Sequence, residues 1–227
     1  MTTVQHYIHG ELREELRKEA TMPLYNPATG QEIGSVPIAS DETRRDVLAS
    51  ATAGAAVWAA SSLSQRSAVL FKFRELLAQS TDELAALITR EQGKTLADAR
   101  GELARGLENV EFACGLIEHL KGDFSSGVAD GVDVHSFREP VGIVLAVTPF
   151  NFPAMVPLWM LANAVAAGNA VIVKPSERDP SAAVRLACQY IAAMSRMSRL
   201  NVAPMPRSTD RRDSFILEMN ISGSLGQ

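Results

Sequence analysis

Apolar residues recur at three- and four-residue steps along the proline-free stretch Pro37–Pro140. This spacing predicts a series of amphipathic helices, because residues three and four apart share one face of a helix. Serines that precede the apolar runs are the expected N-caps, and they are Ser40, Ser64 and Ser80. Glu83 completes a capping box with the last of these serines, and Gly93 ends that helix. A fourth helix is predicted over about Leu96–Leu120, so the N-terminal half is expected to be mainly helical.

The first 40 residues carry the signals of a short pair of strands. The run Tyr25-Asn26-Pro27-Ala28-Thr29-Gly30 is typical of a turn. Apolar residues with strand-like character follow it at Ile33, Val36 and Ile38. We therefore expect two strands that lie on the surface of the molecule.

Two unbroken apolar runs, Ile143–Val147 and Ala170–Val173, predict strands that are covered on both faces. The segment Pro153–Gly168 between them has the length of a crossover helix, and Asp179-Pro180 begins a further helix. This order predicts an α/β fold with a parallel sheet and right-handed crossovers. Ahead of the sheet, Val132–Arg138 alternates as a half-exposed strand does.

The regular patterns end near Ala193. From there to residue 227 the chain shows neither a helical nor a strand period, and it contains five arginines from Arg196 onward. We expect two parts, a folded region over residues 1–193 and a tail over residues 194–227. A shifted or prematurely ended reading frame is the hypothesis for the tail.

Composition narrows the class of protein. Of the 227 residues 46% are hydrophobic and 21% charged, and the formal net charge is −4, which favours a globular protein and argues against a nucleic-acid partner. Two cysteines, Cys114 and Cys188, are too few for a disulfide framework or a four-thiolate zinc site. We find no secretory signal and no apolar run long enough to span a bilayer. A cytoplasmic protein, or a mitochondrial matrix protein in a eukaryote, is expected.

Candidate chemistry lies at the ends of the two predicted strands. In open α/β sheets, ligands bind beyond the carboxyl ends of the strands. Asn151 follows the first strand and offers an amide donor for a developing oxyanion, although an asparagine also simply stabilises turns. Lys174 and Glu177 follow the second strand, where they would grip ribose hydroxyls or form an ordinary solvated pair.

These features together resemble the NAD-dependent aldehyde dehydrogenases, from Tyr7 to about Ala193. The motifs that carry the resemblance are Tyr25-Asn-Pro-Ala-Thr-Gly30, Glu91-Gln-Gly-Lys-Thr95, Pro149-Phe-Asn-Phe-Pro153, Gly168-Asn169 and Lys174-Pro-Ser-Glu177. Most of the wider family has tryptophan at Phe150 and lysine at Met160. At these two positions the chain instead resembles the CoA-acylating methylmalonate-semialdehyde dehydrogenase branch of the family.

The resemblance implies a Rossmann-type sheet, NAD as cofactor and a semialdehyde as substrate. In the family a cysteine attacks the aldehyde, hydride passes to NAD, and in this branch CoA takes the acyl group. Asn151 matches the donor to the oxyanion. The segment Thr148-Pro149-Phe150 matches the nicotinamide side, and Lys174, Ser176 and Glu177 match the adenosine-ribose side.

Arg105 resembles an arginine that this branch uses to hold the substrate carboxylate. The alternative that we keep open is an ion pair with Glu102 or Glu108 on the same helix. Neither cysteine lies in the family's Gly-Gln-x-Cys motif, and the general-base glutamate is also missing. The resemblance therefore implies a truncated and inactive member of a homo-oligomeric family. A CoA-independent semialdehyde dehydrogenase and a non-catalytic partner subunit are the alternatives.

Overall fold

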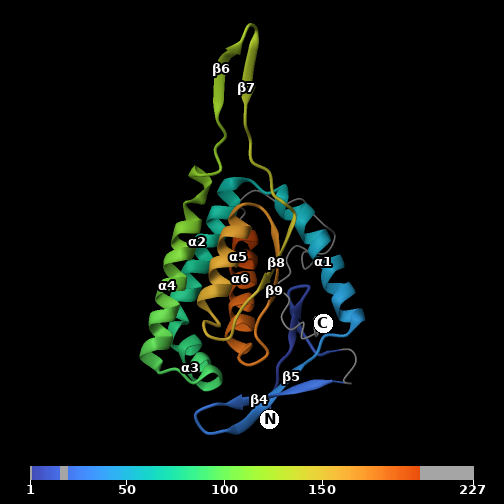
Figure 1. Ribbon diagram of the computed structural model, residues 1–227, viewed down its shortest axis with the longest axis vertical. Helices are drawn as coiled ribbons and strands as arrows, with labels where there is room; N and C mark the ends of the chain where they lie inside the picture. The colour runs from blue at the N-terminus through green and yellow to red at the C-terminus, as the bar shows by residue number, and fades with distance from the viewer. Residues whose placement is uncertain (1, 16–19, 200–227) are drawn as a thin grey trace.

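A computed structural model describes residues 2–15 and 20–199. Helices make up most of it, with small sheets beside them (Figure 1). The helices are α1 (Asp41–Ala59), α2 (Leu63–Gln79), α3 (Thr81–Gln92), α4 (Leu96–Cys114), α5 (Met155–Ala166) and α6 (Ser181–Arg199). The expected helical character of the N-terminal half is confirmed.

The helix ends agree with the sequence in part. Ser40 caps α1 as predicted, and its Oγ accepts a hydrogen bond from the backbone N–H of Thr43. The prediction of Ser64 as the second cap is wrong, because Ser62 caps α2 and forms a capping box with Gln65. Gly93 ends α3 in the left-handed conformation, at φ 90°.

Two further details of the helices differ from the prediction. The capping box at Ser80 is wrong, because Ser80 also ends α2 and its hydroxyl donates to the carbonyl of Leu76 instead. Helix α4 ends at Cys114 rather than near Leu120, and a short 3₁₀ turn follows at Leu116–Glu118. Two helices that share one residue leave no extended position from which a side chain can cap.

The N-terminal strands form two small sheets. Strands β4 (Thr21–Asn26) and β5 (Gln31–Pro37) pair antiparallel, as predicted, and β1 (Thr2–Thr3) joins β5 in parallel. Strands β2 (His6–Ile8) and β3 (Glu11–Arg13) form a separate hairpin.

The central sheet consists of β8 (Ile143–Val147) and β9 (Ala170–Lys174), which pair in parallel and are joined through α5. The predicted parallel pairing is confirmed. The register aligns Val147 with Lys174, so both strands end at the same edge of the sheet. Helix α5 packs against both strands of this sheet.

The two central strands differ in burial. Strand β9 is buried as expected, with Ile172 packed against Val47 and Ala51 of α1. Strand β8 is not covered on both faces, because Leu145 and Val147 remain 58% and 60% exposed. The expectation for β8 is therefore wrong, and the reason is that α1 packs mainly on β9 and leaves this face of β8 open among the described residues.

The hydrophobic core lies between the helices and the inner face of the central sheet. Its largest buried side chains include Trp58, Phe73 and Tyr190. The indole N–H of Trp58 donates to the carbonyl of Val165 at 2.7 Å, which ties α1 to α5. The rings of Phe73 and Tyr190 meet edge to face at 5.4 Å between centroids, which joins α2 to α6.

A hairpin of β6 (Phe124–Ala129) and β7 (Val132–His135) projects far from the body of the molecule (Figure 1). The predicted strand is present, but it ends at His135 and is exposed throughout instead of half-exposed. Alternation within β7 therefore does not reflect burial in this chain.

The C-terminal part is helical for longer than the sequence indicated. Helix α6 continues to Arg199, six residues beyond Ala193. Residues 200–227 of the predicted tail lie outside the described residues, and the division of the chain at residue 193 stays a prediction. In the described ranges no single helix has the length and apolar composition to span a membrane, although the bent pair α1 and α2 meets that test jointly.

Candidate functional site

The two predicted ligand-binding segments leave the central sheet side by side. The backbone N–H of Thr148 donates to the carbonyl of Lys174 at 3.0 Å, which extends the ladder between β8 and β9 by one bond. The connection from β8 to α5 and the connection from β9 to α6 therefore begin at the same edge. The structure brings Asn151 and the Lys174–Glu177 segment to the common edge that the sequence predicted.

The connection after β8 carries Thr148, Pro149, Phe150 and Asn151. Thr148 is buried, whereas the other three are exposed. The backbone carbonyl of Asn151 accepts a hydrogen bond from Nζ of Lys94 at 2.9 Å. Within the part of the chain that the structure describes, no hydrogen bond engages the side-chain amide of Asn151. Its backbone is thus held while its amide remains available to a ligand.

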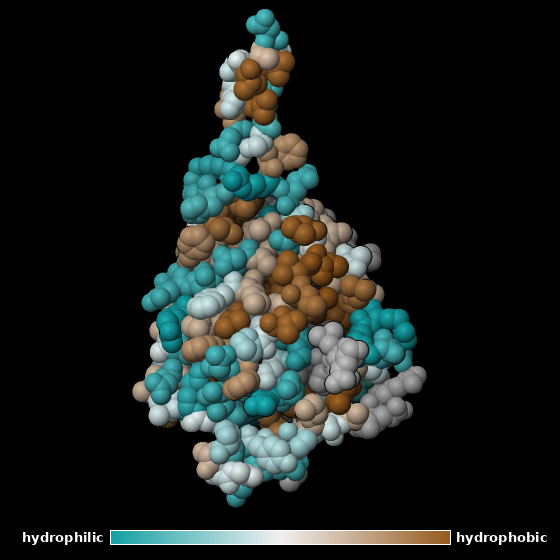
Figure 2. All heavy atoms as spheres, viewed as in Figure 1, coloured by the Kyte–Doolittle hydropathy of each residue, from teal (hydrophilic) through white to brown (hydrophobic). Residues whose placement is uncertain are grey.

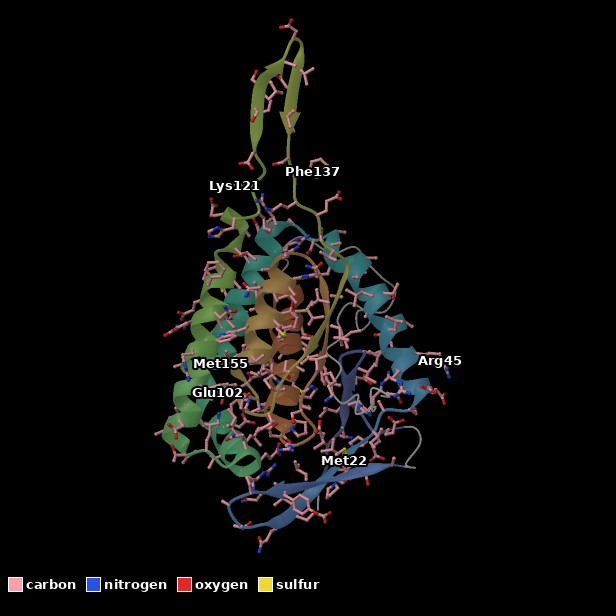
Figure 3. The ribbon with its side chains drawn as sticks, in the orientation of Figure 1. Met22, Arg45, Glu102, Lys121, Phe137 and Met155 are labelled. Atoms are coloured by element: carbon pink, nitrogen blue, oxygen red, sulfur yellow. The ribbon has the colours of Figure 1, made fainter. Side chains whose placement is uncertain are left out.

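Glu102 of α4 holds the other end of the same connection. Its carboxylate accepts the backbone N–H groups of Ala154 and Met155 at 2.8 and 3.0 Å, and its second oxygen accepts from Lys94 at 2.6 Å. Figure 3 shows Glu102 beside Met155 at the start of α5. A negative charge here stabilises the first turn of α5, whose N-terminal N–H groups carry partial positive charge.

The connection after β9 presents a charged pair. Nζ of Lys174 lies 3.3 Å from Oε2 of Glu177. A hydrogen bond from the backbone N–H of Glu177 and then the ammonium of Lys174 hold the pKa of this carboxyl below its ordinary value. Ser176 is buried and its hydroxyl accepts the N–H of Arg178, so it shapes the turn. Glu177 is therefore an ionised acceptor at neutral pH.

Arg178 links the two connections and was missed by the sequence analysis. Its guanidinium carbon lies 4.8 Å from the centroid of the Phe150 ring. A cation over an aromatic face is attracted by the ring's quadrupole. The contact holds the exposed ring of Phe150 against the turn that carries Glu177.

Arg105 lies on the exposed side of α4, near the same edge. Its guanidinium carbon is 5.6 Å from the ring centroid of Phe152, next in sequence to Asn151. The alternative pairing with Glu102 is wrong, because Glu102 serves Lys94 and the start of α5. Among residues 2–15 and 20–199 the contact shown for the Arg105 guanidinium is with Phe152, and no ion pair joins it to Glu108. The guanidinium remains available to an anion.

Two more acids, Glu91 at the end of α3 and Asp179 just before α6, are buried near the connection after β9. Glu91 accepts the backbone N–H of Ser181 at 3.0 Å and so caps α6. Both carboxyl oxygens of Asp179 are buried without a hydrogen-bond partner among the described residues. Burial raises the pKa of Asp179 to about 8, helped by the charges on Glu91 and Glu102 and opposed by Lys94. Glu91 and Lys94 both belong to the motif Glu91-Gln-Gly-Lys-Thr95, which was the one sequence signal for these residues. The motif indicates the family and does not reveal which backbone groups the two side chains contact.

Burial raises the pKa of both cysteine thiols. Burial raises the pKa of the Cys114 thiol to about 11, and it also raises the pKa of Cys188 in α6. A thiolate is the reactive form, so burial disfavours the reactive form of both side chains. In the described ranges no group of three histidines, cysteines or acids is arranged to hold a metal ion.

Comparisons with known proteins give one consistent result. The model of the aldehyde dehydrogenase family matches residues 15–202. A malonate-semialdehyde dehydrogenase of Pseudomonas aeruginosa is 45% identical over 187 residues, which are 82% of this chain and 37% of that protein. The mitochondrial acylating methylmalonate-semialdehyde dehydrogenase of Arabidopsis thaliana is 43% identical over 173 residues, 76% of this chain and 28% of that protein.

Solved structures agree. A protein from Sinorhizobium meliloti, assigned as a methylmalonate-semialdehyde dehydrogenase and complexed with NAD, superposes with a TM-score of 0.85 at 39% identity, over 97% of this chain and 42% of that one. The methylmalonate-semialdehyde dehydrogenase of Oceanimonas doudoroffii gives a TM-score of 0.85 at 38% identity, over 98% and 42%. This chain therefore spans between 28% and 42% of the length of these four proteins.

Proposed function

Because this chain belongs to the aldehyde dehydrogenase family, we propose that the common edge of β8 and β9 binds NAD, as the first part of a malonate- or methylmalonate-semialdehyde dehydrogenase. The observation that carries the proposal is the parallel register of Val147 with Lys174, which sends both ligand-binding connections out at one edge. A relative of similar fold was solved with NAD. The same edge is where open α/β sheets bind dinucleotides.

The adenosine end of NAD is assigned to the connection after β9. The ionised carboxylate of Glu177 accepts ribose hydroxyls, and the ammonium of Lys174 donates to one of them. Ser176 contributes by fixing the turn that presents both groups. Since a carboxylate at this position repels a 2′-phosphate, the chain is expected to prefer NAD to NADP.

The nicotinamide end is assigned to Thr148, Pro149, Phe150 and Asn151. NAD supplies the acceptor for the hydride of the aldehyde. The side-chain amide of Asn151 donates to the carbonyl oxygen as it gains negative charge, a contribution of about 3–4 kcal/mol where such donors have been removed. Its exposed and unengaged amide supports this role.

Arg105 is assigned to the carboxylate of the semialdehyde. Its guanidinium has no acidic partner among the described residues and lies over Phe152, next to Asn151. A planar fork of donors suits a carboxylate. The acylating relative supports CoA as the acyl acceptor.

We assign nucleotide binding, and not turnover, to the 227 residues by themselves. The chain's two thiols, Cys114 and Cys188, have raised pKa values and lie in helices, so neither supports covalent catalysis. An assay of NADH formation with malonate semialdehyde and CoA tests turnover, and a steady rate with the pure chain contradicts the assignment.

The homo-oligomeric state and the compartment that the sequence led us to expect stay predictions. The fully exposed hairpin β6–β7 supports an assembly of subunits.

A nucleotide titration tests the binding site. NAD, NADP and AMP are added to the pure chain while the fluorescence of Trp159, on α5, is followed. We expect Glu177→Gln to weaken NAD and AMP about tenfold, the loss of one hydrogen bond to a charged group. Glu75→Gln is the matched control, because Lys72 and Glu75 form the same i,i+3 pair on α2. Equal affinities for the wild type and Glu177→Gln overturn the proposed site.

A further inference from the structure

One ion pair, with Glu102 buried and Lys94 half-buried, holds the Asn151 connection at two points. Lys94, in the link between α3 and α4, donates to the backbone carbonyl of Asn151 at 2.9 Å. Its partner Glu102, 2.6 Å away, accepts the N–H groups of Ala154 and Met155. The pair therefore grips the backbone immediately before and after Phe152 and Pro153.

Because both side chains are largely removed from water, their hydrogen bonds are needed to stabilise the two charges. The side chains of Lys94 and Glu102 are 14% and 1% exposed. Removing two charges from water is costly unless each is fully hydrogen-bonded. One carboxylate oxygen of Glu102 accepts from Lys94, and the other accepts from the N–H groups at the start of α5. Nζ of Lys94 also lies 4.7 Å from the ring centroid of Phe152. Every one of these contacts beyond the pair itself goes to the connection that carries Asn151.

Glu91 provides an internal comparison. It caps α6 as Glu102 caps α5, through the N–H of Ser181. Its other carboxylate oxygen accepts from Arg90, an exposed residue of its own helix, and not from a lysine that reaches a ligand-binding connection. The two glutamates thus share the capping role, and only Glu102 belongs to a pair that also holds Asn151.

We propose that Lys94 and Glu102 are positioning residues, which fix the backbone of residues 151–155 so that the side-chain amide of Asn151 faces the nicotinamide and the reacting aldehyde. This inference rests on the proposed function for the role of Asn151. It does not extend to the adenosine end, because within the described residues Lys94 and Glu102 make no hydrogen bond to the connection that carries Lys174 and Glu177. They reach that connection only through their charges, which act on Asp179. Loss of the pair therefore weakens one end of the dinucleotide site and spares the other.

The ratio of NAD affinity to AMP affinity tests the proposal. AMP reports the adenosine end alone, whereas NAD reports both ends. In Lys94→Met, which keeps the chain length over Phe152, we expect NAD binding to weaken about tenfold and AMP binding to stay within twofold. Glu102→Gln keeps the shape of the carboxylate without its charge and is expected to act in the same direction if Lys94→Met fails to fold. Glu91→Gln is the matched control and is expected to leave the ratio within twofold of the wild type.

Hydrogen exchange gives a second, ligand-free measurement. The backbone amides of Ala154 and Met155, which donate to Glu102, are expected to exchange at least tenfold faster in Lys94→Met and Glu102→Gln. The hydrogen-bonded amides of Arg178 and Ser181 in the other connection are expected to be unchanged. An unchanged ratio of affinities overturns the positioning role, even if exchange becomes faster. If the wild-type chain binds neither NAD nor AMP, the proposed function fails. In that case hydrogen exchange alone tests whether Lys94 and Glu102 fix the backbone of residues 151–155. Unchanged exchange in both variants would contradict this positioning role.

Discussion

Asp179 shows how a single residue acquires a property that its sequence neighbours do not reveal. It stands just before α6 with its carboxyl group buried, where the charges of Glu91, Glu102 and Glu177 raise its pKa and the charge of Lys94 lowers it. Burial and three like charges all favour the neutral acid. An aspartate before a proline otherwise indicates only a helix start, so this property comes from helices α3 and α4 packing against the turn.

Asp179→Asn is expected to flatten the dependence of stability on pH. The folded-state pKa of about 8 lies above the ordinary value of 3.8, so the stability associated with the neutral acid is complete below pH 3.8 and is lost as pH rises through 8. Asparagine has the same shape and does not ionise. The stability advantage of the variant should grow by on the order of 4 kcal/mol between pH 5 and pH 9, since the window from pH 5 to the folded-state pKa covers about three units and each unit corresponds to about 1.4 kcal/mol.

Urea unfolding at pH 5, 7 and 9 measures this difference. Asp130→Asn, at an exposed position in the turn of the hairpin β6–β7, is the control and should change stability equally at all three values. A constant difference between wild type and Asp179→Asn across this range would show that Asp179 ionises normally.

At the scale of elements, helices begin where backbone geometry permits a cap. Ser62 has an extended backbone, at φ −68° and ψ 156°, and its hydroxyl accepts the N–H of Gln65. Ser64 lies two residues further on, already inside the first turn of α2. Periodicity placed the helix correctly but did not distinguish two serines so close together.

Ser62→Ala is therefore expected to destabilise the fold by about 1 kcal/mol, the usual cost of losing an N-cap. Ser64→Ala should change stability by less than about 0.5 kcal/mol, because an exposed position in the first turn loses no cap. Thermal or urea unfolding of the two variants in parallel gives the comparison. A larger loss in Ser64→Ala than in Ser62→Ala would restore the cap that the sequence suggested.

At the scale of the whole molecule, apolar side chains remain uncovered. Figure 2 shows apolar residues gathered on the projecting hairpin and on the face of the body near β8. Leu145 and Val147 of β8 and Val128 and Val134 of the hairpin are among the exposed residues. Contiguous exposed apolar surface on this scale favours association with another surface.

The double variant Leu145→Thr, Val147→Thr is expected to reduce self-association of the pure chain and its binding of an apolar dye. Threonine keeps the branched shape that suits a strand and makes the face more polar. Light scattering and dye fluorescence measure both effects. Val128→Thr with Val134→Thr tests the hairpin separately, and no change in either double variant would mean that these faces do not drive association.

The parts of the candidate site that depend on the order of strand, turn and helix along the chain were predictable from the sequence. Strand, turn and helix signals follow one another around Asn151 and around Lys174–Glu177, so their place at strand ends was readable from sequence. Lys94, Glu102 and Arg178 were not, because each contacts its partner across a distance in sequence or across two connections. The roles of the predicted residues stay predictions until the titrations are done.

The sequence by itself determined the helical segments, the β4–β5 pair and the parallel pairing of β8 with β9, which places the connections that carry Asn151 and Lys174–Glu177 at one edge of the sheet. It did not indicate β1, the β2–β3 hairpin or β6. Periodicity and turn chemistry are local, and two buried strands joined by one helix have few ways to pair. Only the tertiary structure decided which strand is covered, which carboxylate caps which helix, and which backbone Lys94 holds. Those outcomes depend on packing between segments far apart in the chain, and no local pattern records it.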